Sequence, residues 1–558
     1  MTNISDNPGK DYSGKNYSWI RLAGVLFILF IAYTWAQPFR DIYGLETRNA
    51  LMAREMLENG TSLIPKLLGR PYPDYPPLYF WLETLFSKPL GHITTLSAVL
   101  PSALSAIGIL ALTYFFGRSI NIRTGWLSVL ILATIPNFWL EAGSVTIDML
   151  LAFNITATIL CLHFRDNNQS SAKRIAYTVG ATIFLLFAFL TKGPIGIVLP
   201  AISWGGYLLW ERRWKNLFSF ALFIISIGLL YMAIELIIVY HAGGRQLVYD
   251  VIKMQITGRI TDKANKSFIY YPICLIEIGS IWWLVIISGL ARSYAGKSEK
   301  SMFYQFAKTV TTYPATRLAI MWFLGIFAVF TLAGSKHSRY LLPLYPAAAI
   351  IFACLIETLF ENRPILYENI LRNIINVLIG TILLAGLIFP FLCKQFIFIP
   401  LSFFFIWFAV NIAFWLIVRT RIEEKYKLVG SILLLLIVVL SGSNLMVIPA
   451  YSGMASGRAF ITAAESKVGS EVPVDFYGIS SDGDGIKFAL YSKRKSTEIR
   501  FINTIEELNP ITKPCLLISH LDDKTGFKKF LSENNCDRIM EGKIYSKQFV
   551  ACLLGSGE

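Results

Sequence analysis

The stretch LETRNALMAREMLENGTSLIPKLLGRPYPDYPPLYFWLE, which runs from Leu45 to Glu83, lies between the first two long apolar runs of the chain. It is too polar to lie in lipid, and its residue pattern is too regular for an unstructured loop. Within residues 46–59, Ala, Leu and Met recur at helical spacing with charged residues between them, which predicts a surface helix. Asn59 and Gly60 form a helix stop, so we expect the helix to end there.

A proline-rich elbow follows this helix. Five prolines and one glycine occur between residues 65 and 77, and each proline fixes its own φ and restrains the residue before it. The next segment, LYFWLETLFSKPL, is aromatic and amphipathic, so it is expected to lie in the plane of the membrane interface. We therefore expect two interfacial helices joined by a stiff polar elbow. The alternative interpretation is that this segment only covers the membrane surface and has no catalytic role.

The rest of the chain indicates a polytopic membrane protein. Of the 558 residues, 54% are hydrophobic, which is too apolar for a soluble protein of this size. A helical span needs about 20 apolar residues, and thirteen runs come close to that length or exceed it. They are residues 19–38, 95–116, 124–142, 145–164, 174–191, 195–210, 216–240, 272–292, 316–334, 340–360, 370–393, 398–419 and 427–448. The first run is expected to remain as a span, because no small-residue cleavage site follows it.

The short loops that are rich in Lys and Arg fall on one side of these spans. Arg118, Arg123, Arg212 and Arg213 are examples, and the positive-inside rule places such loops in the cytoplasm. The N-terminus is then cytoplasmic, and thirteen spans place the C-terminal region in the periplasm. Residues 449–558 contain 14 basic and 14 acidic side chains, so the whole net charge of +15 lies before them. This basic balance follows from membrane orientation and does not indicate nucleic-acid binding.

We expect two domains, a transmembrane domain over residues 1–448 and a soluble α/β domain over residues 449–558. The first outer loop spans residues 39–94. In the soluble domain, VPVDFYG, KFALYS, TEIRF, CLLISH and FVACLL predict strands, and GFKKFLSENN predicts a helix. No catalytic constellation stands out in this domain. It is expected to shape the acceptor side or to support the transmembrane domain.

Four further motifs follow the outer loop in order. They are LPSALSAIGILALTYFFGR (100–118), TIDMLLAFN (146–154), LTKGPIGIVLP (190–200) and GSKHSRYLLPLYPAAA (334–349). Together with the ETR, AREML and PP elements of the outer loop, they resemble the landmarks of bacterial GT-C glycosyltransferases of the protein-mannosyltransferase-like superfamily. That superfamily includes the transferase that places aminoarabinose on lipid A. The resemblance covers residues 30–350, and the chain after residue 360 matches in layout alone.

The resemblance implies a GT-C fold with about thirteen transmembrane helices and a soluble C-terminal α/β domain, in the bacterial cell inner membrane. It implies inverting transfer of a sugar from a polyprenyl-phosphate carrier, undecaprenyl phosphate, to an acceptor at the outer face, without a nucleotide sugar. Lipid A or lipopolysaccharide is the expected acceptor, and a protein or another surface glycan is the alternative. A transporter or flippase for a lipid-linked sugar and an inactive carrier-binding relative are competing hypotheses.

Three carboxylates are candidates for the reacting centre. Glycosyl transfer passes through an oxocarbenium-like state, and a carboxylate can orient or deprotonate the incoming nucleophile. The family has Asp-Glu where this chain has Leu45-Glu46, so we expect Glu46 to be catalytic, with Asp74 in support. Stabilisation of the helix dipole is the structural alternative for Glu46. Asp148 is the second candidate, because an ionisable group near the end of an apolar run is costly and usually functional.

The carrier phosphate needs fixed cations at the membrane surface. Lys192 is the first candidate, because it lies in a tight outward turn between two apolar runs, although snorkelling would also explain it. Where the family often has the lysine of a Glu-Lys-Pro-Pro elbow, this chain has Tyr75, which cannot supply charge. The expected substrate-binding residues are Lys192, Arg259, Lys336, Arg339, Tyr340, Tyr345, Arg48 and Tyr75, with Lys66 and Arg70 as further cations nearby.

The sequence indicates no certain cofactor. The five histidines show no metal-ligand spacing, although the carboxylate oxygens of Glu46 and Asp74 could hold a divalent ion. No phosphate-binding glycine loop with its lysine occurs, which argues against an ATP-driven pump. The expected partners are the polyprenyl-phosphate-linked sugar, the lipid A, glycan or protein acceptor and membrane lipid, without nucleic acid.

Overall fold

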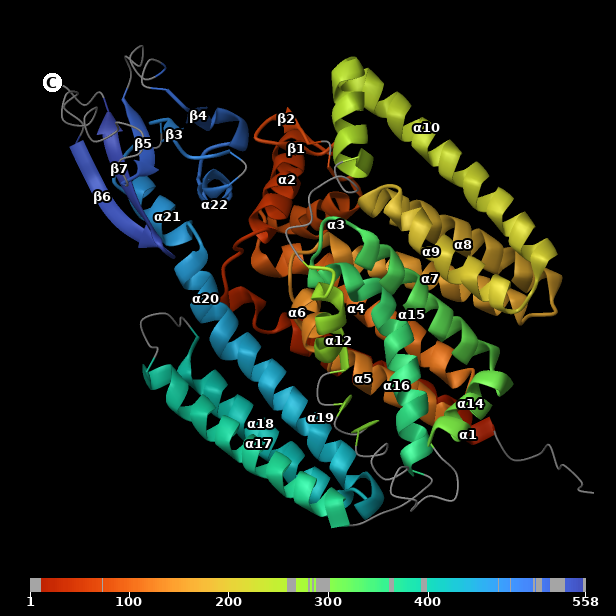
Figure 1. Cartoon of the computed structure of the whole chain (residues 1–558). Helices are drawn as coiled ribbons and strands as arrows, with labels where there is room; N and C mark the ends of the chain where they lie inside the picture. Colours follow the sequence, from red (N-terminus) through yellow and green to blue (C-terminus); the bar gives the residue numbers. More distant parts are fainter. Residues whose placement is uncertain are drawn as a thin grey trace, which may run out of the picture.

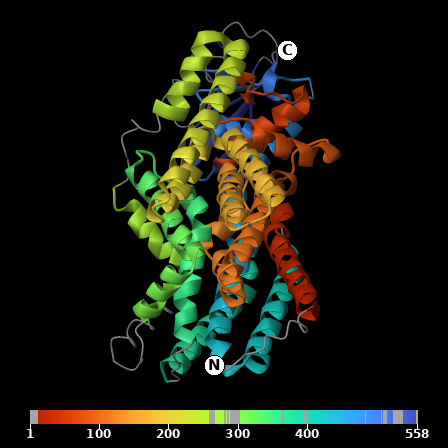
Figure 2. The ribbon, with the colours of Figure 1, turned by 90° about the vertical axis from the view of Figure 1, so that its right-hand side faces the viewer.

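The structure is a computed structural model and shows a bundle of long helices with a β-sheet at one end (Figure 1). It describes residues 12–72, 74–257, 267–279, 282–283, 286–287, 302–360, 366–392, 399–469, 471–481, 483–504, 507, 514–521 and 537–554. Two views at right angles place the sheet at the same end of the bundle as α2 (Glu46–Asn59) (Figures 1 and 2). This end therefore gathers the polar parts of the chain.

Ten helical segments among the described residues are long and apolar enough to cross a membrane, and one bent helix pair makes an eleventh candidate. The ten segments involve α1 (Tyr12–Thr34), α4 (Thr95–Arg118), α7 (Ile147–Asp166), α8 (Ser171–Lys192), α10 (Trp214–Ile252), α15 (Pro314–Leu332), α16 (Tyr345–Phe360), α17 (Leu366–Leu392), α18 (Leu401–Arg421) and α19 (Glu424–Gly442). The shorter helices of the bundle are α5 (Ile122–Ala133), α6 (Pro136–Ala142), α9 (Ile195–Trp210), α12 (Tyr270–Gly279), α14 (Met302–Thr312), η4 (Ser338–Leu344) and α20 (Ile448–Ala455).

The predicted class, a polytopic helical membrane protein, is confirmed. Ten of the thirteen predicted runs coincide with the ten membrane-length segments. Of the other three runs, 124–142 is the bent pair α5 and α6, and 195–210 is the shorter helix α9. The run 272–292 lies partly outside the described residues.

The bend between α5 and α6 measures 71°. Pro136 is the first residue of α6, where it has no N–H to continue α5 and holds Ile135 extended, with a ψ of 120°. The chain after α6 then passes beneath α2, because the amide of Asn49 donates to the carbonyl of Val145 at 3.0 Å. The proline bend thus brings a non-helical segment to the polar end of the bundle.

α7 and α8 form an antiparallel helical hairpin with both free ends at this polar end. The hydroxyl of Thr146 caps α7 by accepting from the N–H of Asp148 at 3.3 Å, and a carboxylate in the first turn suits the helix dipole. α8 ends at Lys192, where Gly193 has a φ of 69° that a glycine adopts without strain. Two charges that are 44 residues apart in the sequence therefore meet.

The first outer loop packs onto this end of the bundle. Besides α2, which spans Glu46–Asn59 as predicted, it comprises β1 (Lys66–Leu67), β2 (Arg70–Pro71) and α3 (Leu78–Ser87). α3 packs between α2 and α4, since Thr84 donates to the carbonyl of Ala53 at 3.1 Å and the hydroxyl of Tyr79 lies 3.1 Å from that of Ser102. The elbow is ordered by Glu55 as well as by its prolines, because this carboxylate accepts from two N–H groups in the turn between β1 and β2.

The carboxyl of Glu83 in α3 is fully buried, and neither oxygen has a hydrogen-bond partner among the described residues. Burial raises the pKa of Glu83 well above its usual range, with the charge of Glu46 adding to the effect. The native protein therefore holds a proton that the unfolded chain releases above about pH 4.3, so Glu83 makes the native state lose stability as the pH rises.

We expect Glu83→Gln to raise the thermal unfolding midpoint at pH 8, and to raise it less at pH 5. The amide does not titrate, so the variant avoids the cost of keeping a proton on Glu83 at high pH. Thermal unfolding of both proteins in the same detergent at the two pH values measures this difference. A midpoint difference that is the same at pH 5 and pH 8 would contradict it.

The C-terminal region contains a five-stranded mixed sheet in the order β4-β3-β5-β7-β6. Its strands are β3 (Val474–Tyr477), β4 (Arg500–Ile502), β5 (Cys515–His520), β6 (Asp537–Ile544) and β7 (Lys547–Leu554), and its helices include α21 (Arg458–Ser466) and α22 (Asp484–Ala489). β3 pairs in parallel with β4 and β5, whereas β7 pairs antiparallel with β5 and β6. The predicted α/β character of this region is confirmed.

One of the predicted strands is wrong. KFALYS, residues 487–492, begins inside α22 instead of forming a strand. Phe488 and Ala489 are fully buried there, and the ring of Phe488 stacks on that of Phe476 in β3. A short apolar run fits a buried helix face as well as a strand, so its pattern alone did not distinguish them. The predicted helix GFKKFLSENN lies outside the described residues.

Polar contacts join the C-terminal region to the first outer loop. Arg54 of α2 donates to the carbonyl oxygens of Ala489 and Arg494 at 2.8 and 2.7 Å. Asp41, which precedes α2, pairs with Arg458 of α21 at 3.0 Å. The C-terminal region thus helps to fix the outer loop over the end of the bundle.

Candidate active site

A polar cavity of about 250 Å³ lies where α2, the end of α6 and the start of α7 meet. It is lined by Tyr43, Gly44, Leu45, Glu46, Arg48, Asn49, Tyr75, Glu141, Ser144, Val145, Thr146, Ile147, Asp148, Lys192 and Arg339. Six of the residues predicted from the sequence are among them, namely Glu46, Arg48, Tyr75, Asp148, Lys192 and Arg339. Five separate parts of the fold therefore contribute predicted side chains to one cavity.

Asp148 lies between two cations in this cavity. One carboxylate oxygen accepts from the ammonium of Lys192, and the other lies 3.0 Å from Nε of Arg339. Asp148 and Lys192 are only 6% and 5% exposed, so this charge group is shielded from water. The ring centroid of Tyr340 lies 4.1 Å from the Lys192 ammonium, which adds a cation–π contact. Asp148, Lys192 and Arg339 taken by themselves carry one net positive charge.

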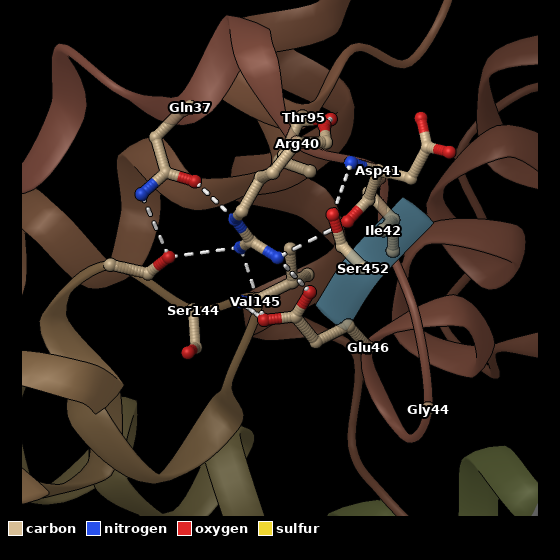
Figure 3. Close-up of polar contacts among 12 residues, drawn as sticks. Gln37, Arg40, Asp41, Ile42, Gly44, Glu46, Thr95, Ser144, Val145 and Ser452 are labelled. Carbon is tan, nitrogen blue, oxygen red and sulfur yellow. Dashed lines mark hydrogen bonds and ion pairs between the residues drawn. The ribbon is translucent and has the colours of Figure 1, made fainter. Parts of the chain in front are cut away.

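Glu46 lines the same cavity, but both of its oxygens are already occupied (Figure 3). The guanidinium of Arg40 donates to them at 2.7 and 3.1 Å, and the N–H of Val145 donates to one of them at 3.1 Å. Arg40 is in turn held by the side-chain oxygen of Gln37 at 2.6 Å and the carbonyl of Gly143 at 2.9 Å. Glu46 therefore joins the start of α2 to the segment between α6 and α7.

We expect Glu46→Leu to destabilise the protein by about 3–5 kcal/mol, because it leaves the buried guanidinium of Arg40 without its carboxylate. The two side chains are only 3% and 13% exposed, so water does not replace the lost partner. Thermal unfolding of the purified variant measures the loss. The double variant Arg40→Met/Glu46→Leu should recover most of it, and equal stability of the single variant and the wild type would contradict this account.

Four predicted residues that the structure describes do not line the cavity, namely Lys336, Tyr340, Tyr345 and Asp74. Tyr345 is buried in the bundle, where its hydroxyl accepts from Asn137 at 2.9 Å. Lys336 is also buried and donates to the carbonyl of Ala333 at 2.7 Å.

The predicted cation Arg48 is not part of the ion pairs around Asp148. Arg48 lines the cavity, and its guanidinium donates to the hydroxyl of Tyr72 at 2.8 Å. Arg259, a predicted phosphate ligand, lies outside the described residues.

Two ionisable side chains that line the cavity, Glu141 and Tyr43, were not predicted from the sequence. Glu141, at the end of α6, interacts electrostatically with Asp148, Arg339 and Glu46, and its carboxylate accepts a hydrogen bond from the side chain of Thr146. The hydroxyl of Tyr43 is the second group; burial, with the charge of Glu46 adding, raises its pKa to about 12, so it stays protonated. The sequence could have indicated Glu141, because a carboxylate inside an otherwise apolar run is costly and often has a function.

An apolar pocket of about 370 Å³ adjoins the polar cavity, and Tyr75 lines both. Its other walls come from the elbow, α3, α8 and α10, with Trp81, Phe189 and Tyr231 as the large side chains. Gly244, with a φ of 67° that suits glycine, breaks α10 so that the chain turns back and Val251 closes the pocket. A charged cavity and an apolar pocket therefore lie next to each other.

No metal site is apparent in the part of the chain that the structure describes. There, no group of three or more His, Cys, Asp or Glu side chains is placed to hold an ion. The predicted pair for a divalent ion does not come together in the cavity, because Glu46 is bound by Arg40 and Asp74 is not among the lining residues. No cofactor is indicated.

The chain is similar to known glycosyltransferases in sequence. Residues 41–242 match the family described as dolichyl-phosphate-mannose-protein mannosyltransferase. The undecaprenyl phosphate-alpha-4-amino-4-deoxy-L-arabinose arabinosyl transferase of Edwardsiella ictaluri is 28% identical over 381 residues, which are 66% of this chain and 64% of that protein. Its counterpart in Shewanella sediminis is 23% identical over 351 residues, which are 62% of each chain. The chain thus spans less than two thirds of the length of these two relatives.

The fold has a solved counterpart. The crystal structure of ArnT from Cupriavidus metallidurans bound to undecaprenyl phosphate matches with a TM-score of 0.70 at 18% identity, over 96% of this chain and 98% of that chain. At this identity the likeness establishes the fold, so the chain is an integral membrane protein with the fold of ArnT. These matches confirm the predicted resemblance to the GT-C glycosyltransferases of the mannosyltransferase-like superfamily.

Proposed function

We propose that this protein transfers a sugar from an undecaprenyl-phosphate carrier to lipid A or lipopolysaccharide at the outer face of the cytoplasmic membrane. The observation that carries the proposal is the pair of cations, Lys192 and Arg339, that lines a cavity beside an apolar pocket, because such a pair suits a phosphate joined to a long hydrocarbon. The names of the relatives support the carrier, and they make an aminoarabinose the first sugar to test. Two sites of opposite character that share Tyr75 fit one amphipathic donor.

In this proposal the carrier phosphate binds to Lys192 and Arg339. Both cations contact Asp148. This carboxylate fixes their positions and, while no phosphate is bound, neutralises part of their positive charge. The first isoprene units then lie in the apolar pocket against Trp81. Arg259 remains proposed as a further phosphate ligand.

The proposed reaction breaks the bond between the anomeric carbon of the sugar and the phosphate oxygen. The electron pair stays on the carrier phosphate, where Lys192 and Arg339 stabilise the added negative charge. The acceptor oxygen forms the new bond from the opposite face of the sugar, which inverts the anomeric centre. Any proton on that acceptor oxygen passes to a carboxylate in the cavity.

We assign that carboxylate to Glu141. The family aspartate is absent at Leu45, and Glu46 has both oxygens bound by Arg40. Glu141 lines the cavity near Asp148 and Arg339, so it lies where an acceptor would approach the bound phosphate. Glu46 then acts as a positioning residue, because it orders the segment that leads from α6 to Asp148.

The orientation in the membrane and the two domains remain part of the proposal. The distribution of Lys and Arg supports a cytoplasmic N-terminus and a periplasmic C-terminal region. The boundary after residue 448 falls within a helical segment that continues from Lys427 to Ala455. We propose that the C-terminal sheet stands over the cavity and shapes the approach of the acceptor.

Mass spectrometry of lipid A and of total surface glycans, from the host with and without this gene, tests the function. We expect deletion to remove one sugar mass from lipid A, and the lost mass names the sugar. A mass lost from a glycoprotein or polysaccharide instead would keep the chemistry and overturn the acceptor. Unchanged lipid A and unchanged surface glycans would overturn the proposed function.

A further inference from the structure

A second polar cavity, of about 310 Å³, lies at the far end of α7 and α8 from the candidate active site. It lies between these helices and α9 and α10, which run side by side (Figure 1). α7 rises about 27 Å from Asp148 to Asp166, at about 1.5 Å per residue. The hydrocarbon core of a bilayer is about 30 Å thick, so this cavity lies at the membrane interface opposite the active site.

The polar side of this second cavity carries excess positive charge. Its acidic lining residue, Asp166, is paired at 2.5 Å with Arg213, which is not among the lining residues. Arg165 and Arg174 also line the cavity, and neither guanidinium has a partner among the described residues. Two unpartnered guanidinium groups facing one cavity favour an anionic ligand.

The other side of the cavity is apolar and adjoins lipid. Trp204, Leu208 and Phe220 form its inner wall and are at most 8% exposed. On the outside, Ile175 of α8 and Phe218 of α10 are 65% and 66% exposed, as expected of side chains that face acyl chains. The ligand therefore meets a charged end, an apolar wall and a lipid-facing surface.

Another basic cavity, formed by α17, α18 and α19, provides an internal comparison. Its Arg372 and Lys427 both pair with Glu424, at 2.9 and 2.6 Å. Its Arg419 lies over the ring of Trp415 at 5.2 Å. These cations already have partners, which sets the cavity at α7 and α8 apart.

We propose that the cavity between α7, α8, α9 and α10 binds the head group of an anionic phospholipid from the leaflet opposite the active site. The head-group phosphate contacts Arg165 and Arg174, and the acyl chains lie along the apolar faces of α8 and α10. A zwitterionic head group would place its own cation beside the two guanidinium groups, so it binds less well. Because α7 and α8 carry Asp148 and Lys192 at their other ends, the bound lipid braces the hairpin that holds the active site.

Native mass spectrometry of the intact purified protein tests this proposal. The protein is given equal amounts of dioleoyl phosphatidylglycerol and dioleoyl phosphatidylcholine, and the retained lipids are counted. We expect roughly tenfold more phosphatidylglycerol than phosphatidylcholine on the wild type, and loss of that preference in Arg165→Gln/Arg174→Gln. Arg165→Lys/Arg174→Lys keeps the charge and should keep most of the preference.

The matched control is Arg118→Gln/Arg123→Gln. These arginines flank the turn between α4 and α5 and do not line the cavity, and the edge-on contact of Phe116 with His163 places the end of α4 beside the end of α7. The control removes the same charge and should keep the preference. Equal retention of the two lipids by the wild type, or equal loss in both double variants, would overturn the site. Displacement of phosphatidylglycerol by millimolar inorganic phosphate would show an anion site without lipid selectivity, and would overturn the lipid proposal as well.

Discussion

Replacement of Lys192 by methionine is expected to lower sugar transfer by at least about a hundredfold, because the variant loses the buried cation that we propose stabilises the leaving phosphate. Lys192 is 5% exposed, pairs with Asp148 and lies over the ring of Tyr340. A lysine exposed to water would not replace a charge held in this way. The rate of transfer to lipid A, measured by mass spectrometry with purified protein, gives the effect.

Two comparisons make the Lys192→Met result specific. Lys88→Met removes a lysine from the first outer loop, and because this residue is exposed, activity should be unchanged. A fluorescent or radiolabelled polyprenyl phosphate should bind more weakly to Lys192→Met than to the wild type. Transfer by Lys192→Met at more than half of the wild-type rate, with a folded protein, would contradict the role of Lys192.

Glu141→Gln is expected to lower kcat by about a hundredfold or more, with little change in the affinity for the carrier. The amide keeps the shape of the side chain but cannot take a proton from the acceptor. Since Glu141 is not proposed to contact the carrier phosphate, binding and chemistry should separate in this variant. Steady-state transfer rates over a range of carrier concentrations provide both quantities.

Asp74→Asn is the matched control for Glu141→Gln. It removes a carboxylate from the same outer surface, but Asp74 does not line the cavity, so the rate should change little. A loss of less than fivefold in Glu141→Gln would mean that the acceptor arrives already deprotonated. An equal loss in both variants would show that a carboxylate outside the cavity matters as much, and would contradict the assignment to Glu141.

The sequence predicted Asp148, Lys192 and Arg339 as separate candidates because they stand at the ends of membrane helices or in a short outward turn, but it did not predict that they pair. Asp148 begins α7 and Lys192 ends α8, so the adjacent antiparallel helices had to bring them together once both spanned the membrane. Arg339 follows from the short outward turn before α16 by the same argument. Hydropathy and loop charge carry this information, and both are visible in one sequence.

The sequence did not predict the parts of the site that depend on tertiary geometry. Glu141 enters the cavity because Pro136 starts a helix bent by 71° from the one before it, and hydropathy treats the pair as one run. The bond of Glu46 to Arg40 depends on how the chain turns before α2, which no periodicity records. Tyr345 belongs to a motif of the family, yet its hydroxyl contacts Asn137 inside the bundle. A motif fixes the order of residues more firmly than the direction of their side chains.

The central claim is tested most directly by transfer in a purified system. The protein in liposomes is given lipid A and undecaprenyl-phosphate-linked 4-amino-4-deoxy-L-arabinose, with no nucleotide present, and lipid A is analysed by mass spectrometry. With the wild type, lipid A should gain the mass of one aminoarabinose. With Lys192→Met, almost no lipid A should gain that mass. No gain of mass with the wild type, from a folded protein that also fails to bind undecaprenyl phosphate, would contradict the central claim.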